Sequence, residues 1–181
     1  MSTISKKICL IGDFGVGKTS LIRRFIDRQF SDRYLSTVGV KISRKIIEQP
    51  ELGRSGKREL QLLMWDIEGS TKFKAIAPSY LQGAKGAIIV GDVTRQETLI
   101  AMPDHARNFL AINPQGSVTL ALNKSDLVEA EKLPRLLQLV QVPHEARILA
   151  TYTTSAKSGQ DVDRIFQTLA DNLLEQHELP V

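Results

Sequence analysis

A glycine-rich stretch near the amino terminus constrains the fold of this 181-residue chain more than any other feature. Residues 12–19 read Gly-Asp-Phe-Gly-Val-Gly-Lys-Thr and match the pattern G-x-x-x-x-G-K-[ST]. The match lies between an apolar run over residues 7–11, which predicts a buried strand, and a segment whose apolar residues recur at helical spacing. Glycines allow backbone N–H groups to turn inward and surround phosphate oxygens. We therefore expect a strand, a phosphate-binding loop and a helix, in that order.

The residues at the end of this loop predict its ligand. The Lys18 ammonium would neutralise the β- and γ-phosphates of a nucleotide, and the Thr19 hydroxyl would bind Mg²⁺. Asp66 ends a later strand-like segment, where a carboxylate can support the metal ion, although a helix N-cap is its alternative role. Gly69 follows, and its N–H could approach the γ-phosphate closely because glycine carries no side chain.

Further apolar runs alternate with helical patterns along the chain. Strands are predicted at residues 40–48, 60–65, 87–90, 118–122 and 148–152, and helices at 95–112, 133–139 and 162–174. Pro103 must either start or kink the helix in which it lies. This β-α-β alternation favours an α/β fold with a mostly parallel, six-stranded sheet and about five flanking helices, in which ligands bind beyond the carboxyl ends of the strands.

Composition limits the class of protein further. The length and the 42% hydrophobic content predict one domain over residues 1–181, and no uncharged apolar stretch is long enough to span a membrane. The lone cysteine, Cys9, excludes an intramolecular disulfide and predicts a reducing, cytoplasmic location. His105, His144 and His177 have no metal-ligand spacing and adjoin no motif, so we expect them on the surface or in loops.

Two short motifs after later strands predict the base that is bound. Residues 123–126 read Asn-Lys-Ser-Asp, and the Asp126 carboxylate can accept two N–H donors that guanine presents and adenine does not. Ser155-Ala156-Lys157 follows the last strand, and a backbone N–H there could reach the guanine carbonyl oxygen. Each motif is also compatible with a polar turn; their order downstream of the phosphate loop favours GTP.

These residues, taken together, resemble the Ras superfamily of small GTPases and most closely its Rab branch. The likeness covers residues 5–175, including 34–40, 73–84 and 91–94. It implies a P-loop small G domain in which Thr37 binds Mg²⁺ and the γ-phosphate, Phe30 packs on the base, and the Lys124 stem covers the other base face. Motifs and resemblance together assign nucleotide binding to Gly12, Asp13, Phe14, Gly15, Val16, Gly17, Lys18, Thr19, Ser20, Phe30, Thr37, Gly69, Asn123, Lys124, Asp126, Ser155, Ala156 and Lys157. They assign Mg²⁺ binding to Thr19, Thr37 and Asp66, and hydrolysis to Lys18, Thr37, Gly69 and the degenerate position Ser70.

The chain departs from the family around the reacting phosphate. Ser70 occupies the place of the glutamine that orients the attacking water, and its side chain is too short for that task. Glu68 adds negative charge beside a phosphate, and the open alternative is that Glu68, Thr71 or Lys72 repositions the water. Phe14 replaces a small residue and could crowd an incoming arginine finger. We therefore expect retained nucleotide binding with slow GTP hydrolysis.

Partner surfaces follow from the resemblance and from charge. The resemblance implies effector and regulator proteins at Ile42, Trp65 and Tyr80. Residues 1–58 carry a net charge of +8 and the remainder −4, so the hairpin over 41–58 could face solvent, an acidic protein or anionic lipid. No motif predicts binding to a nucleic-acid polymer. The carboxyl-terminal residues contain no cysteine and residue 2 is serine, so no lipid anchor is expected, which would suit a prokaryotic member or a shortened chain.

Two rival functions remain open at this point. A scaffold that holds GTP permanently would share every binding residue and differ only in turnover. An ATP-dependent P-loop kinase or ATPase would share the phosphate loop, but Asp126 argues against it.

Overall fold

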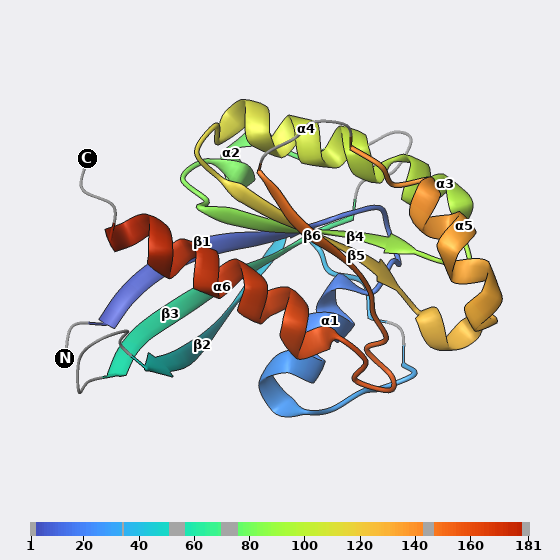
Figure 1. Ribbon diagram of the computed structural model, residues 1–181, viewed down its shortest axis with the longest axis horizontal. Helices are drawn as coiled ribbons and strands as arrows, with labels where there is room; N and C mark the ends of the chain where they lie inside the picture. The colour runs from blue at the N-terminus through green and yellow to red at the C-terminus, as the bar shows by residue number, and fades with distance from the viewer. Residues whose placement is uncertain (1–2, 34, 51–56, 70–75, 143–146, 179–181) are drawn as a thin grey trace.

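A computed structural model describes residues 3–33, 35–50, 57–69, 76–142 and 147–178. Its centre is a six-stranded sheet (Figure 1). The strands are β1 (Thr3–Ile11), β2 (Val40–Pro50), β3 (Lys57–Ile67), β4 (Gly86–Asp92), β5 (Ser117–Asn123) and β6 (Ile148–Thr153). The α-helices are α1 (Lys18–Asp27), α2 (Pro78–Leu81), α3 (Gln96–Ile100), α4 (Met102–Ile112), α5 (Leu133–Gln138) and α6 (Val162–Glu178).

The strand order is β2-β3-β1-β4-β5-β6. β2 and β3 pair antiparallel, and every other neighbouring pair is parallel. The predicted α/β class with a mostly parallel sheet is therefore confirmed. β4 and β5 are interior strands, and all their residues are buried, because helices cover both faces of a parallel sheet.

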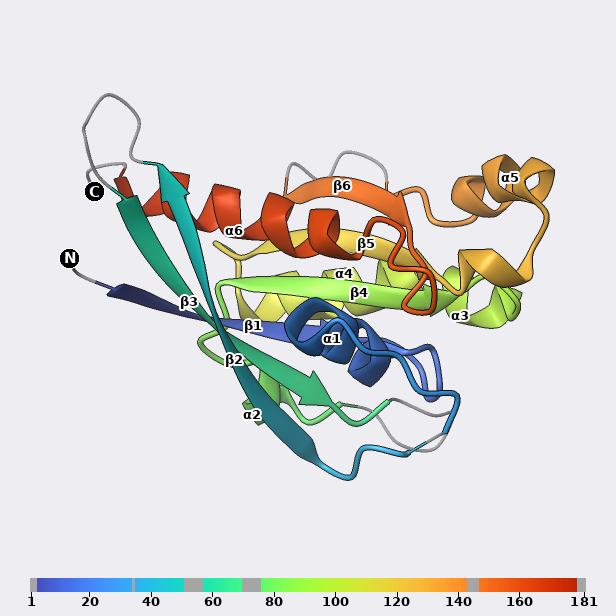
Figure 2. The same ribbon diagram turned by 90° about the horizontal axis from the view of Figure 1, so that it is seen from below.

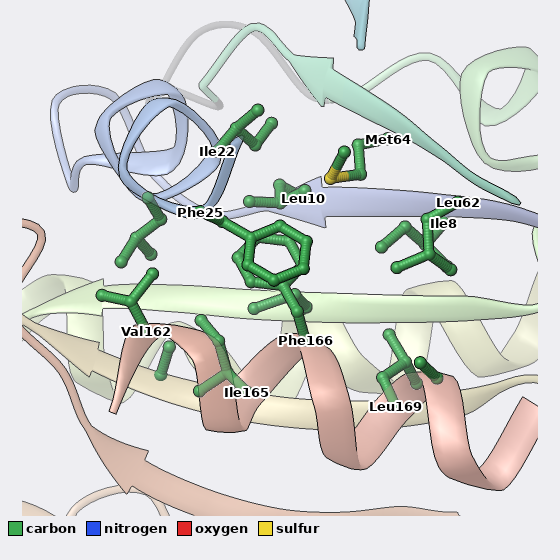
Figure 3. Packing of buried hydrophobic residues seen from close by; sticks show 14 of the residues in the cluster. Ile8, Leu10, Ile22, Phe25, Leu62, Met64, Val162, Ile165, Phe166 and Leu169 are labelled. Carbon is green, nitrogen blue, oxygen red and sulfur yellow. The ribbon is translucent and has the colours of Figure 1, made fainter. Parts of the chain in front are cut away.

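Two apolar layers hold the helices on the sheet. On one face, α1 and α6 pack against residues of β1 and β3; there the rings of Phe25 and Phe166 stack with their centroids 4.0 Å apart (Figure 3). On the other face, α2, α3, α4 and α5 pack around Leu99, Met102 and Phe109. Burying such large apolar side chains stabilises each layer by roughly 2 kcal/mol per residue.

The observed elements differ from the predicted ones mainly at their ends. Residues 95–112 form two helices, and Pro103 is the second residue of α4, so it starts a helix and does not kink one. β1 begins at Thr3, earlier than its apolar run suggested, because its first residues pair with β3 while remaining partly exposed. The short helix α2 was not predicted. Residues 51–56, in the predicted hairpin connection, and residues 73–75 lie outside the described residues.

Parallel strands place their carboxyl ends at one edge of the sheet, and the motif-bearing loops follow those ends. In Figures 1 and 2, α1, α3 and α5 lie at this edge, whereas the start of β1 and the end of α6 lie at the opposite one. The loops after β1, β3, β4, β5 and β6, which are far apart in the sequence, therefore meet at one place.

Candidate functional site

A pocket of about 290 Å³ lies at this edge of the sheet. Its lining includes the predicted residues Phe14, Gly15, Gly17, Lys18, Thr19, Ser20, Phe30, Thr37, Gly69, Asn123, Lys124, Asp126, Ala156 and Lys157. The predicted residues Gly12, Asp13, Val16, Asp66 and Ser155 lie behind this lining and contact it through hydrogen bonds. Ser70 lies outside the described residues. Five separate chain segments thus contribute to one cavity.

The phosphate loop can form only because glycine occupies position 17. Gly17 has φ +103°, a left-handed conformation that residues with a side chain rarely adopt. A Cβ atom there would lie 2.3 Å from the Asn123 amide nitrogen. Position 17 is therefore restricted both by backbone conformation and by the close approach of the Asn123 side chain at the end of β5.

Three side chains from distant segments hold consecutive carbonyl groups of this loop. Arg95 Nη2 donates to Phe14 O at 2.6 Å, Lys124 Nζ to Gly15 O at 2.9 Å, and Asn123 Nδ2 to Val16 O at 3.0 Å. A trans peptide unit points its N–H opposite to its C=O. Each carbonyl that is held on the outside of the loop therefore directs the next N–H toward the inside, where an anion would lie.

Lys18 is the first residue of α1, and its side chain is almost completely buried. Its ammonium donates to Gly12 O at 2.9 Å and Asp13 O at 3.0 Å. Burial lowers the pKa of Lys18 to about 8, although the negative charges of Asp66 and Asp13 oppose the shift. A polyphosphate beside this amine would favour its charged form, so the lysine is poised to bind an anion.

An oxygen cluster lies next to the phosphate loop. Asp66 Oδ2 accepts hydrogen bonds from Thr19 Oγ1 at 2.5 Å and from Thr37 Oγ1 at 3.2 Å, and the two hydroxyls are 2.9 Å apart. The other carboxylate oxygen, Asp66 Oδ1, is buried and has no hydrogen-bond partner among the described residues. Burial raises the pKa of Asp66, although the two threonine bonds and Lys18 oppose the shift.

This cluster fits a magnesium ion. Mg²⁺ is usually held by one or two carboxylates together with substrate phosphates, not by a cage of protein ligands. The described residues contain no group of three His, Cys, Asp or Glu side chains that could form such a cage. The orphaned Asp66 Oδ1 and the two hydroxyls supply oxygen atoms alone, which is the donor type that Mg²⁺ prefers.

The motifs predicted to recognise the base meet at the other end of the pocket. Ser155 Oγ donates to Asp126 Oδ1 at 2.6 Å, which orients that carboxylate. Asn123 Oδ1 accepts from Ala156 N at 3.3 Å and from Thr154 Oγ1 at 3.2 Å. Asn123 therefore joins the phosphate loop to the loop after β6.

Phe30 and Arg24 support the same end of the pocket. Phe30 lines the pocket and also packs against the apolar layer beneath α1, so the base-stacking and core-packing roles are compatible. Arg24 donates to Ala156 O at 2.7 Å and also binds Lys157 O. Arg24 was not predicted, and its helical context carries no motif that could have identified it.

The prediction that His105 lies away from every motif is wrong. Its Nε2 is 2.8 Å from Asp13 Oδ1 in the phosphate loop, and only 14% of its side chain is exposed. α4 packs on the sheet so that its amino-terminal half faces this loop, which periodicity alone does not reveal. His144 and the His177 side chain lie outside the described residues.

Glu68 connects the two segments on either side of the oxygen cluster. Its carboxylate accepts from Gly39 N at 3.0 Å, and its own N–H donates to Gly39 O at 2.8 Å. The segment that carries Thr37 is thereby fastened to the end of β3. The Gly69 backbone lies against the phosphate loop, since a Cβ atom there would be 2.5 Å from Phe14 Cα.

The three predicted effector-facing residues lie close to one another. Ile42 and Trp65 are cross-strand partners of β2 and β3, and Ile42 remains 49% exposed. The Tyr80 hydroxyl would lie 3.8 Å from a Cβ atom on Gly39, the neighbour of β2. Trp65 also receives the Lys7 ammonium 3.6 Å above its ring.

Comparison with known proteins gives the family. A model of the Ras family matches residues 7–175. Rab-13 of Rattus norvegicus is 36% identical over 169 residues, which cover 93% of this chain and 79% of the relative. The GTP-binding protein ypt4 of Schizosaccharomyces pombe is 31% identical over 96% of this chain and 73% of its own length. Human Rab-31 is 29% identical over 95% of this chain and 86% of its own length.

The sheet topology and the phosphate loop define the class of P-loop nucleotide-binding proteins. Within that class, the chain belongs to the Ras family and is Rab-like. It is accordingly a small GTP-binding switch protein, a GTPase that binds GTP or GDP with Mg²⁺ and acts through effector and regulator proteins. No helix among the residues that the structure describes is long and apolar enough to cross a membrane.

Proposed function

We propose that this protein is a guanine-nucleotide switch that hydrolyses GTP slowly, within a single domain over residues 1–181. The oxygen cluster of Thr19, Thr37 and Asp66 carries the proposal. It brings a residue of the phosphate loop helix, one of the segment before β2 and one of β3 to a single point, so a ligand bound there orders all three. Loss of the γ-phosphate would release Thr37 and change the surface that partners contact.

The base end supports guanine selectivity. Asp126 lines the pocket and is oriented by Ser155, so its carboxylate can accept from the two N–H groups of the guanine edge. Lys124 is held on Gly15 O with its stem along the pocket, and Phe30 lines the pocket as well. Ala156 N and Lys157 would complete the contact with the base.

The residues around the reacting phosphate favour slow turnover. Lys18 and the inward N–H groups of the phosphate loop stabilise charge on the phosphates, and Gly69 N–H would face the γ-phosphate. When bound, Mg²⁺ would supply positive charge beside the β- and γ-phosphates. The Glu68 carboxylate is hydrogen-bonded to Gly39, which limits its use in orienting water. Phe14 is 44% exposed at the mouth of the pocket, where an activating arginine from another protein would enter.

A single-turnover hydrolysis assay on GTP-loaded protein tests this proposal. Small GTPases of the Ras type turn over intrinsically at roughly 3–5 × 10⁻⁴ s⁻¹. We expect a lower rate for this protein and a faster one for Ser70→Gln, because the longer amide can orient water against the γ-phosphate. Ser79→Gln, at an exposed serine of α2, is the matched control and should behave like the parent. A parent rate in the ordinary range contradicts slow turnover.

The nucleotide that copurifies with the protein separates this function from a permanently GTP-bound scaffold. Bound GDP is expected for a slow but cycling switch. Bound GTP, with no hydrolysis over a day in the single-turnover assay, would favour the scaffold.

Few exposed basic residues lie beside the partner surface that we propose at Ile42, Trp65 and Tyr80. Of the basic residues on 41–58, Lys45 Nζ lies 3.9 Å above the Phe25 ring, and Lys57 pairs with Glu48 at 2.7 Å. Arg54 lies outside the described residues and Arg58 is only partly exposed, so Lys41 and Arg44 are the exposed cations of β2. Each charge near an anionic membrane adds only about 1 kcal/mol. We therefore favour an acidic protein partner over lipid.

One measurement tests whether the surface binds lipid, and another tests the location of the protein. Sedimentation with vesicles rich in phosphatidylserine should leave the protein in the supernatant, and stable pelleting at physiological salt would contradict it. Fractionation of cells tests the cytoplasmic location that we propose with it.

A further inference from the structure

The carboxylate of Asp92, at the end of β4, lies behind the phosphate loop and is almost completely buried. Its Oδ2 is 2.7 Å from Lys124 Nζ and 3.5 Å from Arg95 Nε. Its Oδ1 accepts from the Thr94 backbone N–H at 2.9 Å and from the Thr94 hydroxyl at 2.6 Å. One carboxylate oxygen therefore faces two cations, and the other faces a turn.

Both cations continue to the phosphate loop. Lys124 Nζ also donates to Gly15 O, and the guanidinium of Arg95 also donates to Phe14 O through Nη2. These carbonyls belong to consecutive peptide units, whose N–H groups are those of Gly15 and Val16. Asp92 is thus the common anchor of two side chains that orient two neighbouring donors of the loop.

We infer that Asp92 is a positioning residue for the nucleotide: it clamps Lys124 and Arg95 onto the phosphate loop and thereby sets how long the nucleotide stays bound. This inference rests on the proposed nucleotide site. Asp92 does not line the pocket, so it acts through the two cations and not by contact with the ligand.

Electrostatics give the reason for this dependence. The Arg95 side chain is 37% exposed and that of Lys124 is 34% exposed, so without a buried partner both cations would turn toward water. Burial alone would raise the pKa of Asp92, but the hydrogen bonds from Lys124 and Thr94 together hold it below its ordinary value. Asp92 is therefore charged at neutral pH and can hold both cations in place.

The competing role for Asp92 is to stabilise the turn before α3. That role uses separate atoms: Thr94 binds Oδ1, and the Thr98 hydroxyl binds the Asp92 backbone N–H and carbonyl and the Arg95 carbonyl, not the Asp92 carboxylate. Substitutions can consequently remove the hold on Lys124 and Arg95 while keeping the turn, or weaken the turn while keeping that hold.

Release of fluorescently labelled GDP from the full chain, loaded with Mg²⁺ and chased with excess GDP, tests the inference. Asp92→Asn keeps the shape and an oxygen acceptor but removes the charge, and it should accelerate release at least tenfold. Thr94→Val removes a hydrogen bond from the same carboxylate while leaving both ion pairs, and it should stay within twofold of the parent. Arg95→Met should accelerate release about threefold to tenfold. The double variant Asp92→Asn/Arg95→Met should be no faster than Asp92→Asn alone, because Asp92 acts through Arg95, which is no longer held on the loop once the carboxylate charge is lost.

Each outcome decides the question. Release from Asp92→Asn within twofold of the parent, or equal acceleration by Thr94→Val, would mean that Asp92 only stabilises the turn. Thermal unfolding of the same variants reports on the turn, and both Asp92→Asn and Thr94→Val should lower the unfolding midpoint. If Asp92→Asn does not fold, the exposed Arg95→Met decides, and release within twofold overturns the clamp. A parent chain that fails to bind labelled GDP would refute the proposed site as well.

Discussion

The buried side-chain amide of Asn123 should contribute strongly to nucleotide affinity. Its Nδ2 holds Val16 O, and its Oδ1 accepts from Ala156 N and Thr154 Oγ1. Asn123→Ala removes three hydrogen bonds at a position that is 1% exposed. At about 1 kcal/mol net for each bond, the cost is roughly 3 kcal/mol.

This loss should appear in binding because the three bonds join the phosphate loop to the loop after β6, which we propose contacts the base. A cost of roughly 3 kcal/mol corresponds to about a 100-fold rise in the GDP dissociation constant. Equilibrium titration with fluorescently labelled GDP measures it, and urea unfolding of the nucleotide-free protein reports the accompanying loss of stability.

Asn113→Ala is the matched control. Asn113 is also buried, and its Nδ2 donates to Leu81 O at 2.9 Å and Phe109 O at 3.4 Å, away from the pocket. It should lower the free energy of unfolding by about 2 kcal/mol while leaving GDP affinity within twofold. Equal weakening of GDP binding by both variants, or binding by Asn123→Ala within threefold of the parent, would refute the reasoning.

Three further predictions follow from the same structure. Asp126→Asn should shift preference from GDP to xanthosine diphosphate in competition binding, because the amide presents a donor to the base edge; indifference would argue against guanine recognition. Phe166→Ala removes one ring of the stacked pair and should lower the unfolding free energy by about 3–5 kcal/mol in urea titrations; a loss below 1 kcal/mol would contradict its central place in the core. Lys18 has a native pKa of about 8, below its unfolded value, so the unfolded state holds the proton more tightly. The free energy of unfolding of the nucleotide-free protein without Mg²⁺ should therefore rise by about 1 kcal/mol between pH 7.5 and 9. Urea unfolding at each pH should be measured in a Cys9→Ala variant, because burial raises the pKa of Cys9 to about 12 and this thiol lowers the free energy of unfolding as pH rises through 9. A free energy of unfolding that stays flat or falls between pH 7.5 and 9 would contradict the Lys18 assignment.

Local patterns were sufficient to predict most of the residues that line the pocket. Residues 12–19 carry their function in consecutive positions, since the glycines, Lys18 and Thr19 must be adjacent to form the loop and begin α1. Asn123, Lys124 and Asp126 are likewise grouped after one strand. The α/β class followed from short apolar runs that alternate with helical patterns, because a strand buried on both faces has no polar side to interrupt it.

Long-range packing was not predictable in the same way. The His105–Asp13 contact joins residues 92 positions apart, and the Arg95–Phe14 contact joins residues 81 positions apart. Histidine and arginine occur in many surroundings, so neither side chain signals its partner. The rotation of α4 on the sheet and the turn after β4 determine where these groups lie.

The amino-acid sequence by itself determined the ligand class, the order of the elements and most of the residues that line the pocket, because those depend on neighbours in the chain. Only the tertiary structure decided that Asp92, Arg95, Arg24 and His105 support the pocket and that Glu68 is bound to Gly39. The physical reason is that a hydrogen bond or ion pair depends on the distance between two atoms, and for residues far apart in the chain the packing of the helices on the sheet sets that distance.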